Sequence, residues 1–395
     1  MEWYSYQRID LNEFRSEMMN DEEMSYTTQF FQKNIDIRHY DDFVLGADVG
    51  GTTTNIAVAG IKAGVVDLFF SLNFETKNLS NFLPALQQTL SFAKEEYNIH
   101  VSKGCIGAAG IVSHNHTFVE LTNILWNIDT NALVKKTSMN RLFILNDFQV
   151  LGYSLNAIDF NDETDIITIR KTDVDEWKKP RVLLGGGTGL GKTILRYDTK
   201  NELFHAFESE GGHVDIPVYT DAELELIKFI QQKKHPQYPV TYEDILSGNG
   251  IVDIYTFLQS KKRFEESKFT AIINQGDDKP ALISKYRLND EYCKETFRLF
   301  RRFFARCAKN LALDFLSLGG VFIAGGIVIK NKDIFLSNEF KTEFNQNYMQ
   351  SNFLKKIPLY LVTNYYLSLQ GACFAAAHAE VILNNQNVTR IVRGE

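Results

Sequence analysis

The chain has 395 residues, of which 44% are hydrophobic and 23% are charged, a composition typical of a soluble globular protein with two or three domains. Its net charge of −7 and the lack of a basic block argue against a nucleic-acid or membrane-surface partner. Neither a signal peptide nor an apolar run of transmembrane length is present, and the four cysteines lack metal-ligand spacing, so we expect a reduced, cytoplasmic protein.

The first 42 residues are polar and acidic and precede the first clear strand. Their pattern is compatible with one short helix, over Asp10–Met19. Chain ends without a buried periodic pattern are commonly disordered. We therefore predict that residues 1–42 form an N-terminal extension outside the main fold, with partial order against the body or another subunit as the alternative.

The segment Phe43–Gly60 contains two apolar, β-branched runs on either side of a Gly-Gly pair. This alternation predicts two strands joined by a tight turn. Adjacent glycines let backbone N–H groups approach an anion, and the threonine hydroxyls that follow add polar groups. Asp48 ends the first strand, where a carboxylate can face a cation or its waters. An ordinary β-hairpin fits the same segment, so the turn alone does not identify a phosphate site.

Strands and helices alternate through the rest of the first 157 residues. The predicted strands lie at 65–74, within 103–112 and 120–129, and at 141–148, and the predicted helices lie at 81–97 and 150–157. Asn146 and Asp147 are the polar residues at the end of the strand at 141–148. Polar groups collected at strand ends are typical of α/β folds that bind ligands beyond the carboxyl ends of their strands.

The segment Gly186–Thr193, GGTGLGKT, matches the P-loop pattern. A P-loop requires a helix directly after it, because the helix N-terminus supplies part of the anion site. Here an alternating segment follows and turns at Asp198–Asn201. We therefore predict a hairpin and not a P-loop NTPase. The glycines remain able to bind phosphate, whereas Lys192 is expected to be a solvated hairpin residue.

The second half of the chain is richer in helices. We predict helices at 220–233, with a capping box of Thr220 and Glu223, at 240–246, at 289–318 and at 370–382, and a strand at 321–326. The helix at 289–318 is the longest and carries a phenylalanine-rich stripe that is typical of core. Glycine-rich turns in separate halves of the chain indicate a duplicated domain.

Four stretches together resemble the sugar-kinase, heat-shock ATPase and actin superfamily: DVGGT at 48–52, LND at 145–147, GGGTGLG at 185–191 and VFIAGG at 321–326. ESEGGHVD at 208–215, EDILSGNGIVDIY at 243–255 and LTNILW at 121–126 are similar to segments of the bacterial-type glucokinase family, in that family's order. The resemblance covers residues 43–378. It implies an α/β fold of two ribonuclease-H-like domains, of the actin and hexokinase type, with a cleft between them. We expect a small domain of residues 43–157 plus 372–395 and a large domain of residues 158–371.

The resemblance further implies a glucokinase, which transfers the γ-phosphate of ATP to the 6-hydroxyl of glucose. Asp147 would be the general base, and Asp48 would orient Mg²⁺ through water. The residues implied to bind sugar hydroxyls are Asn123, Asn146, Glu210, His213 and Glu243. The residues implied to bind the nucleotide are Gly50, Gly51, Thr52, Thr53, Gly187, Thr188, Gly189, Gly325 and Gly326. The protein would be a cytoplasmic homodimer.

Physical chemistry supports these roles independently. A carboxylate in contact with a hydroxyl assists its attack by about 10²–10⁴-fold. Asp147 stands where a strand ends and a helix begins, so the helix dipole favours its ionised form. Carboxylates, amides and an imidazole match the donors and acceptors of a sugar. Thr53 departs from the family pattern, because it stands where Asn is common.

Each of these residues also fits another interpretation. Asp147 fits a helix N-cap, Glu243 a first-turn residue favoured by the helix dipole, and Asn123 a residue that shapes a loop. His213 fits a structural histidine or, with Glu210, a metal ligand. Three rival functions remain open: a sugar-sensing protein without catalysis, an ATPase of the chaperone or actin type, and a kinase for another hexose or an amino sugar.

Overall fold

The computed structural model describes residues 25–122, 124–172 and 176–387, which form two compact units. Of the described residues, unit 1 contains those up to residue 157 and those from residue 366 onward. Unit 2 contains residues 158–365. The predicted helix at Asp10–Met19 and the predicted sugar ligand Asn123 lie outside the described residues.

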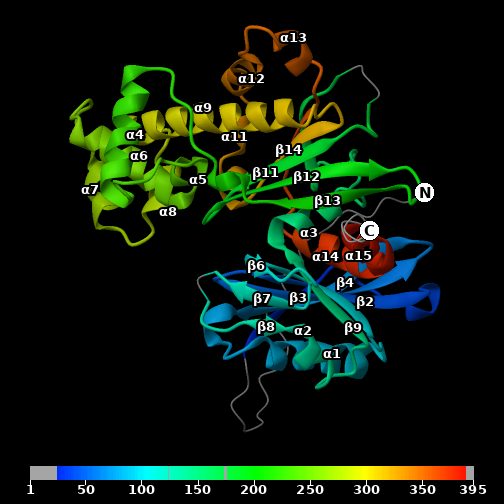
Figure 1. Cartoon of the computed structure of the whole chain (residues 1–395). Coiled ribbons are helices and arrows are strands. Elements are labelled where there is room, and N and C mark those ends of the chain that lie inside the picture. Colours follow the sequence, from blue (N-terminus) through cyan, green and yellow to red (C-terminus); the bar gives the residue numbers. More distant parts are fainter. Residues whose placement is uncertain (1–24, 123, 173–175, 388–395) are drawn as a thin grey trace. The chain divides into compact units, whose positions relative to one another are not determined.

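Unit 1 is built on a six-stranded sheet with the order β1-β4-β3-β2-β5-β9 (Figure 1). Its strands are β1 Tyr26–Phe30, β2 Asp42–Val49, β3 Thr53–Lys62, β4 Val65–Glu75, β5 Lys103–Ala108 and β9 Arg141–Asn146. The strands β2, β3 and β4 form an antiparallel meander, and β2, β5 and β9 run parallel. A small second sheet contains β6 Gly110–Val112, β7 Phe118–Leu121 and β8 Ile128–Asp129. The predicted pair of strands around the Gly-Gly turn is confirmed.

Helices cover both faces of this sheet (Figure 1). They are α1 Phe82–Tyr97, α2 Thr130–Val134, α3 Asp147–Ser154, α14 Leu367–Ala377 and α15 Ala379–Asn387. The helix α1 begins where the sequence predicts, because the Asn81 side chain accepts a hydrogen bond from the backbone N–H of Leu83 at 3.0 Å. The helix α14 packs against β2, β5 and α3, so the last part of the described chain completes the core of unit 1.

Residues 26–42 pack against the rest of unit 1, which agrees with the alternative of order against the body and not with an extension outside the main fold. The strand β1 pairs with β4 in antiparallel register, with Tyr26 opposite Phe74. The ring of Tyr40 packs edge-on against that of Phe69, with the centroids 4.8 Å apart. The strand β1 is a short edge strand with the sequence YTTQF and only partial burial, so its alternation is too weak to predict from the sequence.

Unit 2 contains a second six-stranded sheet, with the order β10-β15-β14-β11-β12-β13. Its strands are β10 Ile166–Arg170, β11 Arg181–Gly186, β12 Leu190–Asp198, β13 Leu203–Ser209, β14 Gly320–Ala324 and β15 Leu359–Val362. Here β11, β12 and β13 are antiparallel, and β11, β14 and β15 are parallel. This arrangement repeats that of β2, β3, β4, β5 and β9, with a glycine-rich turn between the first two strands each time. The predicted α/β fold and its duplication are confirmed.

The segment that matches a P-loop is a hairpin, as predicted. The strand β12 follows the glycines directly and pairs with β11, with Lys192 opposite Leu184. The expectation for Lys192 itself is wrong, because its side chain is only 5% exposed. The sequence could not reveal this, since β12 becomes an interior strand only when β13 and the helices of unit 2 cover it.

The helices of unit 2 gather mainly on one side of its sheet, with α9 running across it (Figure 1). They are α4 Asp221–Lys234, α5 Tyr242–Ile245, α6 Gly248–Ser260, α7 Lys268–Gln275, α8 Lys279–Lys285, α9 Glu291–Asp314, α10 Gly326–Lys330, α11 Lys332–Leu336, α12 Asn338–Asn345 and α13 Ser351–Leu354. The predicted stripe on α9 is buried from Phe297 to Leu311, whereas Phe315 lies past the helix end and is 40% exposed. None of the helices in the described part of the chain combines the length and the hydropathy of a membrane span.

Candidate active site

The carboxyl ends of β2, β5 and β9 meet at one edge of the unit 1 sheet. Val49 pairs with Ala108, and Ala108 pairs with Asn146, so these three residues form one row across the strands. Asp48 precedes this row on β2 and Asp147 follows it at the start of α3, and β2 and β9 are two strand spacings, about 10 Å, apart. The structure thus brings two of the predicted functional carboxylates to the same sheet edge.

Asp147 is the first residue of α3, and Asn146 is its N-cap. The Asn146 Oδ1 atom accepts hydrogen bonds from the backbone N–H groups of Phe148, at 2.9 Å, and Gln149, at 3.3 Å. The Asp147 Oδ1 atom also accepts from the Phe148 N–H, at 2.9 Å. The capping role that the sequence allowed for Asp147 therefore belongs to Asn146. Asp147 is half-buried in the first turn, where the helix dipole favours a carboxylate.

Thr76 stabilises the turn at Gly50–Thr52 through two hydrogen bonds. The Thr76 Oγ1 atom donates to the Gly50 carbonyl at 2.7 Å, and the Thr76 N–H donates to the Thr52 carbonyl at 2.9 Å. The Gly50 N–H donates to the carbonyl of Thr53, at 2.9 Å. Gly51 and Thr52 themselves are exposed, so the outer side of the turn is open to a ligand. Thr76 lies 26 residues from Gly50, and no sequence motif marks it as part of this turn.

Asp48 is held by a residue that the sequence does not single out. The Ser368 Oγ atom on α14 donates to Asp48 Oδ2 at 2.6 Å. Burial raises the pKa of the Asp48 carboxyl above its ordinary value, although the hydrogen bond from Ser368 lowers it in part. Ser368 follows Asp48 by 320 residues and lies in an otherwise small and apolar helix, so only the fold connects the two.

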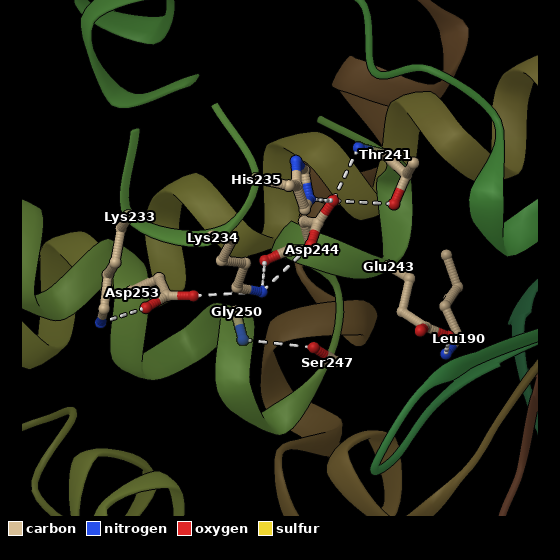
Figure 2. A network of polar contacts seen from close by, with 10 residues as sticks. All are labelled: Leu190, Lys233, Lys234, His235, Thr241, Glu243, Asp244, Ser247, Gly250 and Asp253. Atoms are coloured by element: carbon tan, nitrogen blue, oxygen red, sulfur yellow. Dashed lines mark hydrogen bonds and ion pairs between the residues drawn. The ribbon is translucent and has the colours of Figure 1, made fainter. Parts of the chain in front are cut away.

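Unit 2 carries the second glycine-rich turn, at Gly187–Gly189. The Gly187 N–H donates to the Gly189 carbonyl at 2.8 Å, and the Gly248 N–H donates to the Gly187 carbonyl at 3.0 Å. The Glu243 Oε2 atom accepts from the backbone N–H of Leu190 at 2.9 Å, as Figure 2 shows. Glu243 lies in the first turn of α5, as one interpretation of the sequence held, and there it ties this helix to the glycine-rich turn.

The residue after Glu243 fixes α5 in place (Figure 2). The Asp244 Oδ2 atom accepts from the N–H of Thr241 at 2.9 Å and from its hydroxyl at 3.0 Å. Its Oδ1 atom accepts from Lys234 Nζ at 3.1 Å. Burial raises the pKa of the Asp244 carboxyl, but the hydrogen bonds from Thr241 and Lys234 outweigh it and leave this pKa below its ordinary value. Glu243 thus projects from a helix whose start is well anchored.

Gly325 and Gly326 lie beside this second turn. Gly325 has a φ of 101°, in the region that favours glycine, and a Cβ atom there would stand 2.5 Å from the Gly186 carbonyl oxygen. Gly186 ends β11 directly before the turn at Gly187–Gly189. A Cβ atom added at Gly326 would meet nothing within 4 Å. Two of the segments predicted to bind nucleotide, Gly187–Gly189 and Gly325–Gly326, are therefore neighbours in unit 2. The backbone at Gly326 is exposed to solvent.

Glu210 and His213 lie at the two ends of one tight turn. The turn Gly211–His213 is a 3₁₀ helix, and the Glu210 Oε2 and His213 Nε2 atoms are 3.7 Å apart. Their side chains are 83% and 58% exposed, so His213 is not a buried structural histidine. In the described ranges, no group of three or more His, Cys, Asp or Glu side chains is arranged to hold a metal ion.

The turn at 210–213 and the start of α5 are adjacent. The Tyr242 N–H donates to the Val214 carbonyl at 3.0 Å, and Asp215 forms an isolated β-bridge with Thr241. A Cβ atom on Gly212 would clash with the Leu190 carbonyl oxygen, so the turn lies directly on β12. Unit 2 therefore brings the Glu210–His213 turn and the helix of Glu243 together, next to the glycine-rich turn that precedes β12.

Comparison with known proteins gives a consistent result. A sequence model of the glucokinase family matches residues 45–379. A glucokinase from Nostoc sp. (strain PCC 7120) is 30% identical over 348 residues, which cover 85% of this chain and 98% of that protein. A glucokinase from Helicobacter pylori (strain J99) is 29% identical over 333 residues, covering 83% of this chain and 94% of that protein. The crystal structure of a glucokinase from an Antarctic psychrotroph aligns with a TM-score of 0.70 at 26% identity, over 85% of this chain and 98% of that one.

Proposed function

This chain belongs to the glucokinase family, and we propose that it transfers the γ-phosphoryl group of ATP to the 6-hydroxyl of glucose with Asp147 as the general base. Family membership makes it an ATP-dependent hexose kinase. The observation that best supports the role of Asp147 is its place in the first turn of α3, on the sheet edge that also carries Asp48. The helix dipole favours the ionised form of a carboxylate at such a position.

In the proposed reaction the 6-hydroxyl oxygen of the sugar attacks the γ-phosphorus. Asp147 accepts the hydroxyl proton as the bond between oxygen and phosphorus forms. The bond between the γ-phosphorus and its bridging oxygen breaks, and ADP leaves with the electron pair. This assistance contributes about 10²–10⁴-fold to the rate, and the remainder comes from positioning and charge neutralisation.

We propose that the residues predicted to bind sugar hydroxyls do so: Asn123, Asn146, Glu210, His213 and Glu243. Glu243 then has two tasks, because the same carboxylate accepts the hydrogen bond from Leu190 that ties α5 to the second turn. Polar groups that a bound sugar covers reject an analogue that lacks a hydroxyl, since they would lose the hydrogen bond to it.

We propose that the two glycine-rich turns bind the phosphates of ATP, with Gly325–Gly326 under the adenosine. Magnesium is held in such enzymes by one or two carboxylates, waters and substrate phosphates. Asp48 and the hydroxyls of Thr52 and Thr53 fit this preference for oxygen ligands, and Asp48 would hold the ion through water. When bound, Mg²⁺ neutralises the negative charge of the phosphate being transferred. The active form is proposed to be a cytoplasmic homodimer, for which light scattering of the 45.2 kDa subunit is the direct test.

The proposed activity is tested by a coupled assay with a panel of hexoses and phosphate donors. Glucose with ATP and Mg²⁺ is expected to give the highest kcat/KM. A preference for another hexose or an amino sugar would replace glucose in the proposal and leave the kinase chemistry in place. Binding of sugar without turnover on any donor would instead identify a sugar-sensing protein.

We predict that Asp48→Asn leaves the fold at least as stable as wild type at pH 7 but weakens the binding of Mg²⁺. Because the pKa of Asp48 is raised in the folded chain, its ionisation costs folding free energy above the unfolded value of 3.8. The variant should therefore melt at or above the wild-type Tm at pH 7, and this advantage should vanish below pH 3.8, where both forms are neutral. The half-saturating Mg²⁺ concentration should rise about 10–100-fold. Calorimetry measures the Tm, and a Mg²⁺ titration measures the half-saturating concentration. A lower Tm of the variant at pH 7 would contradict a raised pKa of Asp48 in the folded chain.

We predict that His213→Ala weakens glucose binding more than ATP binding. The imidazole is 58% exposed, so its removal should leave the fold intact. Loss of one hydrogen bond to the sugar should raise the Kd for glucose about tenfold, with little change for ATP. Titration calorimetry measures both constants, and the exposed His114 provides a matched His114→Ala control. A larger loss of ATP affinity than of glucose affinity would remove His213 from the sugar site.

A further inference from the structure

The side chain of Lys192 is a buried cation whose contacts are not used by the proposed chemistry. Lys192 follows the second glycine-rich turn on β12, between β11 and β13. Only 5% of it is exposed. Lysine is rarely buried to this extent unless its ammonium group is satisfied, because desolvation of a charge is costly. The neighbours of this ammonium group therefore indicate what it does.

The ammonium group has three neighbours, all in unit 2. Its Nζ atom donates to the Gly211 carbonyl at 2.5 Å. It lies 4.7 Å from the centroid of the Tyr242 ring, over the face of that ring. It also lies close to the Cys307 thiol of α9. Burial raises the pKa of this thiol to about 11, although the Lys192 charge lowers it in part, so Cys307 stays a neutral thiol.

Two of these neighbours belong to the segments proposed to bind sugar. Gly211 is the first residue of the tight turn between Glu210 and His213. Tyr242 is the first residue of α5 and directly precedes Glu243. Lys192 therefore contacts both segments. It also lies two residues after Leu190, whose N–H donates to Glu243.

The turn at Gly211–His213 has few other internal supports. The Gly211 N–H donates to Ser209 Oγ at 3.1 Å, and the His213 N–H donates to the Glu210 carbonyl at 3.0 Å. The Val214 N–H reaches the Gly211 carbonyl only at 3.5 Å. The charged hydrogen bond from Lys192 is the shortest of the contacts named here, and charge-assisted bonds are about twice as strong as neutral ones.

We propose that Lys192 is a positioning residue for the hexose, which fixes the turn of Glu210 and His213 on β12 through the Gly211 carbonyl. The expected effect on sugar binding rests on the proposed function. The anchoring of the turn by Lys192 does not depend on that function. Without the ammonium group, the Gly211 carbonyl loses its strongest partner. The two exposed side chains at the ends of the turn then lose their fixed spacing.

The test compares variants at position 192 with a matched control. Lys192→Met and Lys192→Gln both remove the ammonium group, and Lys192→Arg keeps a cationic donor on a long stem. Lys200→Met makes the same change at an exposed lysine in the turn between β12 and β13. Hydrogen–deuterium exchange of the segment 209–216 reports on the turn, and steady-state kinetics report KM for glucose and for ATP separately.

The Met and Gln variants are expected to exchange the amides of 211–214 at least about tenfold faster and to raise KM for glucose about tenfold or more, with KM for ATP within about twofold of wild type. Lys192→Arg should recover most of the glucose KM, and Lys200→Met should change neither quantity. Unchanged exchange in 209–216 would overturn the inference, and so would equal increases in both KM values. If wild type neither binds nor phosphorylates a hexose, the proposed function fails, while the exchange experiment still decides whether Lys192 anchors the turn.

Discussion

Replacement of Asp147 by asparagine is expected to lower kcat for glucose phosphorylation by about 10²–10⁴-fold, with little change in the Kd for glucose. Asparagine has nearly the same shape, and its Oδ1 atom can still accept the hydrogen bond that the Phe148 N–H makes with Asp147. It cannot take a proton from the sugar hydroxyl. The substitution therefore removes the proposed base and keeps the start of α3, and Asp147→Ala should show a loss of similar size.

The coupled assay gives kcat, and titration calorimetry with glucose gives the Kd. A matched control is Asp129→Asn, because Asp129 also lies at a helix start in unit 1, where it caps α2 by accepting from Asn131 and Ala132. That variant should keep kcat within about twofold of wild type. An Asp147→Asn protein with undiminished turnover would remove the base assignment, and one that no longer binds glucose would turn Asp147 into a sugar ligand.

Replacement of Arg306 by methionine is expected to lower the free energy of unfolding by about 3–5 kcal/mol, the loss typical of a buried ion pair with one partner removed. Arg306 is 1% exposed on α9. Its Nη1 atom donates to both carboxylate oxygens of Glu223, each at 2.9 Å, and its Nε atom donates to Glu343 at 2.5 Å. Methionine fills much of the same volume, but it leaves the buried Glu223 carboxylate without this donor.

Chemical denaturation of wild type and variant measures the loss. Arg298→Met is the matched control, because Arg298 lies on the same helix, is 43% exposed and pairs with Glu295. The Arg298 guanidinium stays partly in solvent, and ion pairs near the surface contribute about 0–1 kcal/mol, so this control should lose less stability than Arg306→Met. Adding Glu223→Gln to Arg306→Met should restore part of the stability, since it removes the buried charge that has lost its Arg306 partner. An equal effect of both arginine substitutions would contradict the assignment of the stability to the buried pair.

This ion pair also predicts a pH dependence. Burial raises the pKa of the Glu223 carboxyl, but the hydrogen bonds from Arg306 and the Tyr219 N–H and the charges of Arg306 and Arg302 outweigh it, so the pKa lies below the ordinary 4.5. A carboxyl with a lowered pKa stabilises the fold fully above its unfolded value. Its contribution should therefore be lost as the pH falls below 4.5, and Arg306→Met should flatten this part of the stability curve.

The parts of the site that the sequence predicted are those with a local signature. The strand ends at Asp48 and Asn146, the two glycine-rich turns and the hairpin after Gly186 all follow from patterns within about 20 residues. Such patterns decide strand, turn and helix because side-chain periodicity is a local property.

The parts that the sequence missed depend on contacts between distant segments. Ser368 reaches Asp48 across 320 residues, and Thr76 braces a turn 26 residues before it. Lys192 was expected to be solvated, because lysine side chains in hairpins usually are. It is a buried donor because β13 and the helices of unit 2 cover β12. The edge strand β1 was missed for a related reason, since its pairing with β4 decides its structure more than its own residues do.

Unit 2 is one continuous stretch of chain, whereas the described part of unit 1 is built from two stretches, residues 25–157 and residues 366–387. On the ribosome, the first segment of unit 1 emerges early but lacks α14, which packs against β2 and β5. Unit 2 has all of its strands once residue 365 has left the exit tunnel, so it can fold before unit 1 is complete. The nascent first segment therefore presents an apolar sheet face that α14 does not yet cover, and such transiently exposed surface is prone to aggregation.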